Sequence, residues 1–232
     1  MSRYAVTCVI AASVLMPTCS VLVAQEQSGR AGDEPASLSP GEIDTEASRV
    51  FVFVDRDGLG HVHGIEGTIE SGTVHLGADQ EAGEIVFDMA SFTADTDAAL
   101  EHTGVEREVD ESEKTEVTAK MRGDQVLYVE TYPTATFRID SAERLAEDTE
   151  EGHPRFALEG EFTLCGTTQP LSVVAVRDGQ TDGKLHLAGD FTIEQTDYGI
   201  EPYSTAFGLV SVADELRIWG DLWLAAESAE TP

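Results

Sequence analysis

The chain has 232 residues and is strongly acidic, with 44 Asp and Glu residues against 14 Lys and Arg residues and a formal net charge of −30. A surface of this sign repels phosphate groups, which argues against nucleic acid and anionic lipid headgroups as partners. The sequence also lacks P-loop, dinucleotide-binding, G-x-S-x-G and H-E-x-x-H patterns, so we expect no enzyme activity.

Residues 1–24 predict a secretory signal peptide. Arg3 precedes an apolar run over residues 4–16 and a second one over residues 21–23, and a polar sequence begins at Gln25. The run is shorter than the ~20 apolar residues of a membrane-spanning helix, and no later segment is apolar enough to span. We therefore expect a periplasmic or secreted protein without an integral membrane segment.

Residues 25–47 are rich in Gly, Ser, Pro and Glu and poor in aromatic residues, which predicts a disordered linker. One domain is expected over residues 48–226, followed by a short tail at 227–232. Removal of the signal peptide leaves Cys165 as the only thiol, so no internal disulfide forms. We interpret Cys165 as a structural residue in a strand region.

Short segments with alternating apolar and polar residues dominate the expected domain, as is typical of antiparallel strands with one buried face. The apolar faces comprise Phe156, Leu158, Phe162 and Leu164; then Leu185, Leu187, Phe191 and Ile193; then Leu216, Ile218, Leu222 and Leu224. Gly160, Gly189 and Gly220 lie on the same faces, where a missing side chain lets a strand coil sharply. Such coiling is expected in a small closed barrel.

Residues 97–123 interrupt this alternation and predict one or two short helices. Asp110 followed by Glu113 resembles a capping box, Val117 and Met121 share a helix face, and Gly123 is a stop signal. An amphipathic helix inserted between strands most simply plugs one end of a barrel.

Several motifs, in order, are similar to those of the YceI-like family of exported polyisoprenoid-binding proteins, over about residues 48–226. They are Tyr132, Pro133, Thr136 and Phe137; Gly160, Thr163, Leu164, Gly166 and Pro170; Asp197, Tyr198 and Gly199; and the stretch GLVSVADE at residues 208–215. One departure concerns the histidine that many members carry after the first strand. Its place falls near Arg56, so no role of that histidine carries over.

The resemblance implies an all-β fold with short helices, a lipocalin-like eight-stranded antiparallel β-barrel with helices over one opening. It also implies an apolar cavity that holds a polyisoprenoid chain, such as that of a prenyl quinone, as a ligand and without a cofactor. Burial of such a chain contributes ~0.8 kcal/mol for each CH₂ and needs no charged contact. We expect the ligand to contact residues that alternate along two strands, although each could instead pack in a filled core: Phe156, Leu158, Phe162, Leu164, Leu187, Phe191 and Ile193.

Two other functions stay open. In the stretch HVHGIEG, a strand would place His61 and His63 on one side, where both could bind a metal ion with His75 or Glu66 as a third ligand. Alternatively, the glycines indicate a bend, and the segment only lets the strand curve so that the barrel wall can close.

The other possibility is a stress or structural protein that acts through its surface, with Trp219 and Trp223 as a partner patch. Alternation alone does not say whether these tryptophans or the leucines line the interior. A homodimer is also possible.

Overall fold

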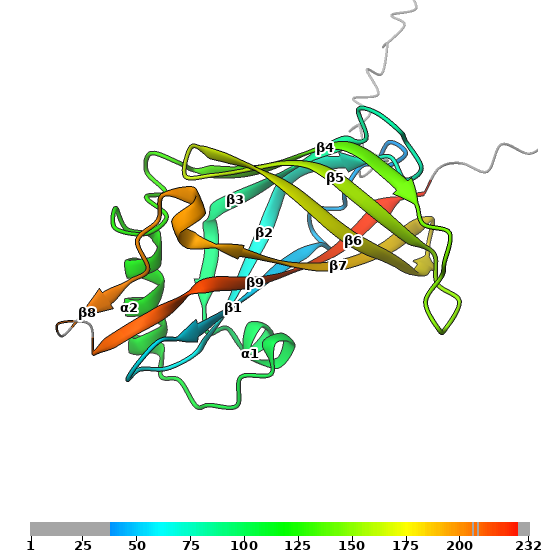
Figure 1. Ribbon diagram of the computed structural model, residues 1–232. Helices are drawn as coiled ribbons and strands as arrows, with labels where there is room; N and C mark the ends of the chain where they lie inside the picture. Colours follow the sequence, from blue (N-terminus) through cyan, green and yellow to red (C-terminus); the bar gives the residue numbers. More distant parts are fainter. Residues whose placement is uncertain (1–37, 206, 208, 227–232) are drawn as a thin grey trace, which may run out of the picture. The chain divides into compact units, whose positions relative to one another are not determined.

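The computed structural model describes residues 38–205, 207 and 209–226 (Figure 1). The predicted signal peptide, the first part of the predicted linker and the tail at 227–232 lie outside these residues. The strands are β1 Arg49–Arg56, β2 His63–Val74, β3 Gly83–Ala94, β4 Thr134–Arg144, β5 Arg155–Leu164, β6 Thr167–Thr181, β7 Lys184–Glu194, β8 Ser204–Thr205 and β9 Val210–Ala225. The helices are α1 Asp97–Thr103 and α2 Glu111–Arg122, with a 3-10 turn at Gln195–Tyr198.

The described strands form a closed antiparallel barrel. Each of β1 to β6 pairs with the next strand in the chain, β7 pairs with β9, and β9 returns to pair with β1. The two-residue strand β8 adds only a short ladder to the beginning of β9. The predicted eight-stranded, lipocalin-like barrel is therefore confirmed.

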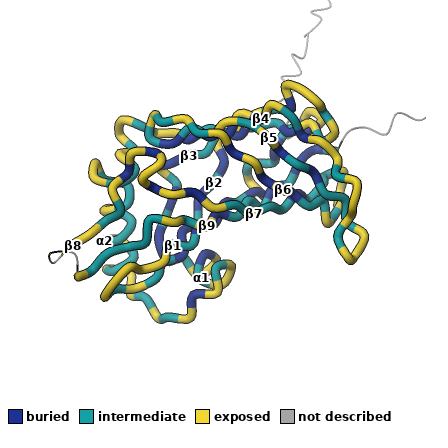
Figure 2. The backbone as a smooth tube through the Cα atoms, viewed as in Figure 1, coloured by how far each residue is buried: buried dark blue, intermediate teal, exposed yellow. Residues whose placement is uncertain are grey.

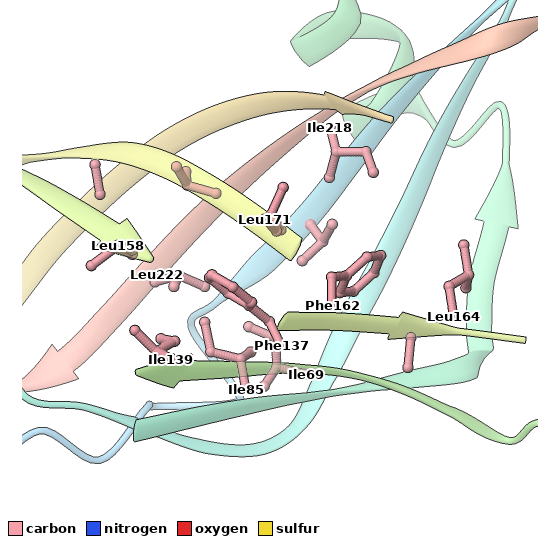
Figure 3. Packing of buried hydrophobic residues seen from close by; sticks show 14 of the residues in the cluster. Ile69, Ile85, Phe137, Ile139, Leu158, Phe162, Leu164, Leu171, Ile218 and Leu222 are labelled. Atoms are coloured by element: carbon pink, nitrogen blue, oxygen red, sulfur yellow. The ribbon is translucent and has the colours of Figure 1, made fainter. Parts of the chain in front are cut away.

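The apolar faces of β5, β7 and β9 point into the barrel. Buried and more exposed residues alternate along these strands (Figure 2). Leu158, Phe162 and Leu164 of β5 converge inside with Ile218 and Leu222 of β9 (Figure 3). This arrangement identifies the leucine face of β9 as the inner one, and the two tryptophans lie outside.

Gly160 is required by the close approach of β4 to β5. A Cβ atom at this position would lie 2.0 Å from the carbonyl oxygen of Arg138, which no side chain can accommodate. Gly189 and Gly220 face each other across β7 and β9. A Cβ atom would have 3.2 Å to its nearest neighbour at Gly189 and 3.8 Å at Gly220, so of these three glycines Gly160 is the one that sterics enforce most strongly.

The two helices were both predicted, but they occupy different places. Asp110 caps α2 by accepting a hydrogen bond from the amide of Glu113, and the helix stops at Gly123 as expected. The inner face of α2 covers the barrel opening. In contrast, α1 packs on the outer wall, where His102 stacks on Phe51 of β1 with ring centroids 4.1 Å apart. Only α2 fulfils the expected role of a plug.

The prediction of a disordered linker is wrong for residues 38–47. The strand β1 has 8 residues, whereas its neighbours β2 and β9 have 12 and 16. Residues 41–44 extend the wall beyond the start of β1: the amide of Ile43 donates to the carbonyl of Gly72 at 2.9 Å, and that of Asp44 donates to Trp223 at 2.7 Å. The side chain of Ile43 is 2% exposed. The segment is ordered because it satisfies strand edges that β1 is too short to reach.

The expected strand position of Cys165 is wrong, because Cys165 and Gly166 form the two-residue turn that joins β5 to β6. Both have positive φ angles, 48° and 75°, as a primed hairpin turn requires. Burial raises the pKa of the Cys165 thiol, which makes it a poor nucleophile. Within the described residues, no helix has the length and apolar character needed to cross a membrane.

Candidate ligand-binding site

An apolar cavity of about 380 Å³ occupies the end of the barrel that α2 covers. Val50, Val52 and Val54 of β1 line one side, and Val117 and Met121 of α2 close the top. Period-two alternation positions the three valines, and the i, i+4 spacing on α2 brings the other two side chains to the same helix face. The cavity is therefore enclosed by strand residues and by one helix face.

Three phenylalanines form the floor of this cavity. Phe162 meets Phe87 and Phe191 in edge-to-face geometry, with centroid distances of 6.0 and 6.2 Å, and contacts Tyr198 at 5.6 Å. Beyond them lies a second pocket of about 50 Å³, which Phe87 and Phe191 also line. We call Phe87, Phe162 and Phe191 the aromatic floor. It separates the large cavity from the deep pocket.

The residues predicted to contact a ligand fall into three groups. Phe162, Leu164, Phe191 and Ile193 line the large cavity. Leu158 and Leu187 line the deep pocket, together with Phe191. Phe156 lines neither: it is 5% exposed and lies 5.9 Å below the guanidinium of Arg144. Whether these side chains contact a ligand stays a prediction.

The polar side chains near the opening are mostly paired. Arg107 forms an ion pair with Glu113 of α2. Lys120 donates to Glu116 at 2.6 Å and lies 5.4 Å from the ring centroid of Tyr203; the hydrogen bond to Glu116 is the main reason that the pKa of Lys120 is raised. These pairs form a polar rim around an apolar interior, which is the usual composition of a small-molecule site.

His63 stands at the boundary between this rim and the cavity. Its Nδ1 atom lies 2.8 Å from Oδ2 of Asp95, a side chain with no solvent exposure. The other carboxylate oxygen of Asp95 accepts a hydrogen bond from the amide of Gly64 at 3.2 Å. The Nη1 atom of Arg107 lies 4.0 Å from Oδ2. The imidazole is thus held in one orientation.

Comparison with known proteins places the chain in a family. The model of the YceI-like domain matches residues 42–222. The chain belongs to the YceI-like family. Among curated proteins, none matches this chain in sequence.

Two solved structures share the fold of this YceI-like chain. BcnA from Burkholderia cenocepacia is 15% identical in sequence and superposes with a TM-score of 0.51. The match covers 78% of this chain and 98% of BcnA. A polyisoprenoid binding domain from Saccharophagus degradans, implicated in plant cell wall breakdown, is 13% identical in sequence and superposes with a TM-score of 0.51. The match covers 82% of this chain and 100% of that domain.

The metal site considered for His61 and His63 is not assembled in this YceI-like barrel. Glu66 points outward and accepts a hydrogen bond from Thr96 at 2.7 Å. His75 follows the far end of β2, ~40 Å along the strand from His63 at ~3.3 Å per residue. Within residues 38–205, 207 and 209–226, no group of three His, Cys, Asp or Glu side chains is placed to hold a metal ion. The described part of the chain therefore does not bring the proposed ligands together.

The glycines of HVHGIEG serve close packing. A Cβ atom at Gly64 would lie 2.8 Å from the carbonyl oxygen of Ala99 in α1, and one at Gly67 would meet the ring of Phe92 at 2.5 Å. The segment has a structural role, as one interpretation held, but its glycines leave room for the neighbouring helix α1 and for the ring of Phe92.

The outward tryptophans do not form an open patch in this member of the YceI-like family. Trp219 is half-buried between His102, in edge contact at 5.6 Å, and Arg217, 4.7 Å from the ring. Trp223 packs against His186, with centroids 4.7 Å apart. His186 in turn hydrogen-bonds Asp178 and Asp221. Burial alone would lower the pKa of His186, but these hydrogen bonds outweigh it and raise that pKa.

Sequence reasoning missed the lining residues on β1, β3 and α2. The period-two alternation of Val50, Val52 and Val54 was a usable signal, and Val117 and Met121 were recognised only as a helix face. No local pattern indicates the pairing of His63 with Asp95, which are 32 residues apart.

Proposed function

We propose that this protein is exported and holds the apolar chain of an isoprenoid lipid, such as a prenyl quinone, inside its barrel without catalysing a reaction. The observation that carries the proposal is the cavity of about 380 Å³ with an almost entirely apolar wall. The similarity in fold to a polyisoprenoid binding domain supports it, as does membership of the YceI-like family.

The physical basis for affinity is burial of hydrocarbon. Each CH₂ group transferred from water contributes ~0.8 kcal/mol, so a few isoprene units suffice for useful binding. The cavity volume lies at the lower end of the ~300–1,000 Å³ typical of small-molecule sites. Because the contacts are apolar, the high negative charge of the exterior does not oppose binding.

The test is to purify the protein from its native source, extract it for lipid analysis and weigh it by native mass spectrometry. We expect a co-purified isoprenoid and a mass that lacks residues 1–24. The same spectrum reports the oligomeric state. A fluorescence titration of ligand-free protein with prenyl quinones then gives the affinity.

A matched pair of variants locates the binding. Val52→Trp places an indole in the cavity, whereas Val174→Trp places one on the outer wall, where Val174 is 40% exposed. We expect the first variant to lose prenyl quinone binding and the second to retain it. The proposal would be contradicted if the purified protein carried no lipid and did not bind added prenyl quinones. Equal binding by both variants would also contradict it.

A further inference from the structure

The hydrogen bonds of Asp95 determine which nitrogen of His63 carries a proton. An ionised carboxylate only accepts hydrogen bonds. One oxygen of Asp95 accepts from the amide of Gly64, and the other lies 2.8 Å from Nδ1 of His63, so this nitrogen must donate. The neutral ring is therefore the Nδ1–H tautomer, and its Nε2 atom carries a lone pair.

A nearby guanidinium balances the charge of this carboxylate. Arg107 lies 4.0 Å from Asp95, and its Nη1 donates to the carbonyl of Val62 at 3.4 Å, next to His63 in the chain. Arg107 also pairs with Glu113. Because Arg107 supplies a positive charge beside Asp95, the ring of His63 is not required to supply one.

The Nε2 atom belongs to a side chain that lines the cavity and is free to accept a hydrogen bond. His63 lines the cavity, and its side chain is 14% exposed. Among the described residues, Nε2 has no hydrogen-bond partner, and no unpartnered side-chain nitrogen or oxygen is buried. The atom is therefore not buried, and it belongs to a side chain that lines the cavity.

Several other polar groups that line the cavity are already engaged. Glu116 pairs with Lys120, and the side-chain amide of Gln195 donates to the carbonyl of Ala213 at 2.8 Å. Glu113 pairs with Arg107. Among these wall groups, His63 offers a fixed acceptor that still lacks a donor.

We infer that His63 binds a hydroxyl group at the polar end of the ligand, so that the site prefers an isoprenoid alcohol or a hydroquinone to an ether or a hydrocarbon of the same chain. This inference rests on the proposed function, since the apolar chain must occupy the cavity for its polar end to reach the rim. Asp95 acts as a positioning residue, because it fixes the tautomer without touching the ligand.

The test compares ligands that differ only at the polar end: geranylgeraniol, its methyl ether and the corresponding hydrocarbon. Dissociation constants are measured at about pH 8, above the range in which histidines ordinarily ionise. For the wild-type protein we expect the alcohol to bind about twofold to tenfold more tightly than the ether, the range that one net hydrogen bond supplies. The ether has no proton to donate to Nε2.

Two variants separate the acceptor from its support. In Asp95→Asn, the amide oxygen still accepts from Gly64 and the amide nitrogen donates to Nδ1, so the ring proton moves to Nε2. The ether then gains a donor, and its affinity should rise to within about twofold of that of the alcohol. In His63→Leu, the preference for the alcohol should also disappear, because no acceptor remains.

The control is His75→Leu, at the far end of β2, which should keep the wild-type preference. An equal affinity for alcohol and ether in the wild type overturns the inference, as does a preference that persists in His63→Leu. In either case, binding of the hydrocarbon shows that the proposed function stands. A failure of all three ligands to bind overturns both. If Asp95→Asn does not fold, the wild-type ligand series and His63→Leu still decide.

Discussion

The aromatic floor predicts how affinity depends on the length of the bound chain. The pocket beyond the floor has about 50 Å³, far below the ~300 Å³ at the lower end of small-molecule sites, so we expect the bound chain to stop at the floor. In the wild type, affinity should rise with each added isoprene unit until the chain reaches the floor and should then level off. Replacement of Phe162 by Ala removes the ring that contacts Phe87 and Phe191, and we expect it to join the two spaces that these two residues line.

The expected magnitude follows from burial. A five-carbon isoprene unit gains at most about 4 kcal/mol, at ~0.8 kcal/mol for each carbon, and ordering of the chain reduces this figure. Even a third of it corresponds to about tenfold in affinity. In Phe162→Ala, affinity should therefore continue to rise for at least one further unit. The variant should also lose about 3–5 kcal/mol of unfolding free energy, as is usual for a buried phenylalanine.

The assay is a titration with prenols that differ by one isoprene unit, with unfolding in urea as the measure of stability. Phe51→Ala is the matched control, because Phe51 and Phe162 are both 6% exposed but Phe51 packs outside the barrel against His102. It should destabilise the protein without moving the length at which affinity levels off. The reasoning is refuted if the curve of Phe162→Ala levels off at the same length as that of the wild type.

Three further predictions concern the barrel wall. His186→Gln should reduce stability more near pH 5.5 than near pH 9. The pKa of His186 is raised in the folded state, so the protonated ring stabilises the protein at low pH, and this contribution is lost as the pH rises through the folded-state pKa. Urea unfolding at both pH values checks this. Gly160→Ala should cost about 1–3 kcal/mol or more because of the carbonyl oxygen at 2.0 Å, whereas Gly220→Ala should stay within about 0.5 kcal/mol, and equal unfolding midpoints would contradict the steric argument. Ile43→Ala should cost about 2–5 kcal/mol in the same assay, and a negligible loss would mean that the segment before β1 is not part of the folded unit.

The strands and their inner faces could be predicted because the relevant signal is local. Alternation in β5, β7 and β9 requires only neighbouring residues, and so do the cap of α2 at Asp110 and its stop at Gly123. Alternation does not say which face of β9 is the inner one, since a strand has two sides. The structure resolves it through the packing of Ile218 and Leu222 in the core.

Features that depend on distant residues could not be predicted from the sequence. The segment around Ile43 reads as a linker because its hydrogen-bond partners, Gly72 and Trp223, lie in two strands far along the chain. The pairing of His63 with Asp95 likewise depends on how β2 and β3 align. The packing of α1 against the barrel depends on Gly64, because a side chain there would collide with the carbonyl oxygen of Ala99. From the sequence alone, this glycine indicates a bend.

The hydrogen bonds of residues 41–44 set the boundary of the smallest piece that should fold alone. A recombinant fragment that starts at residue 48 would leave the amide of Val74 and the carbonyls of Gly72, Trp223 and Ala225 without their partners, on the two strands that flank residues 41–44. Exposed backbone of this kind recruits strands from other molecules. Such a fragment should aggregate on expression, whereas one that starts at residue 38 should remain monodisperse.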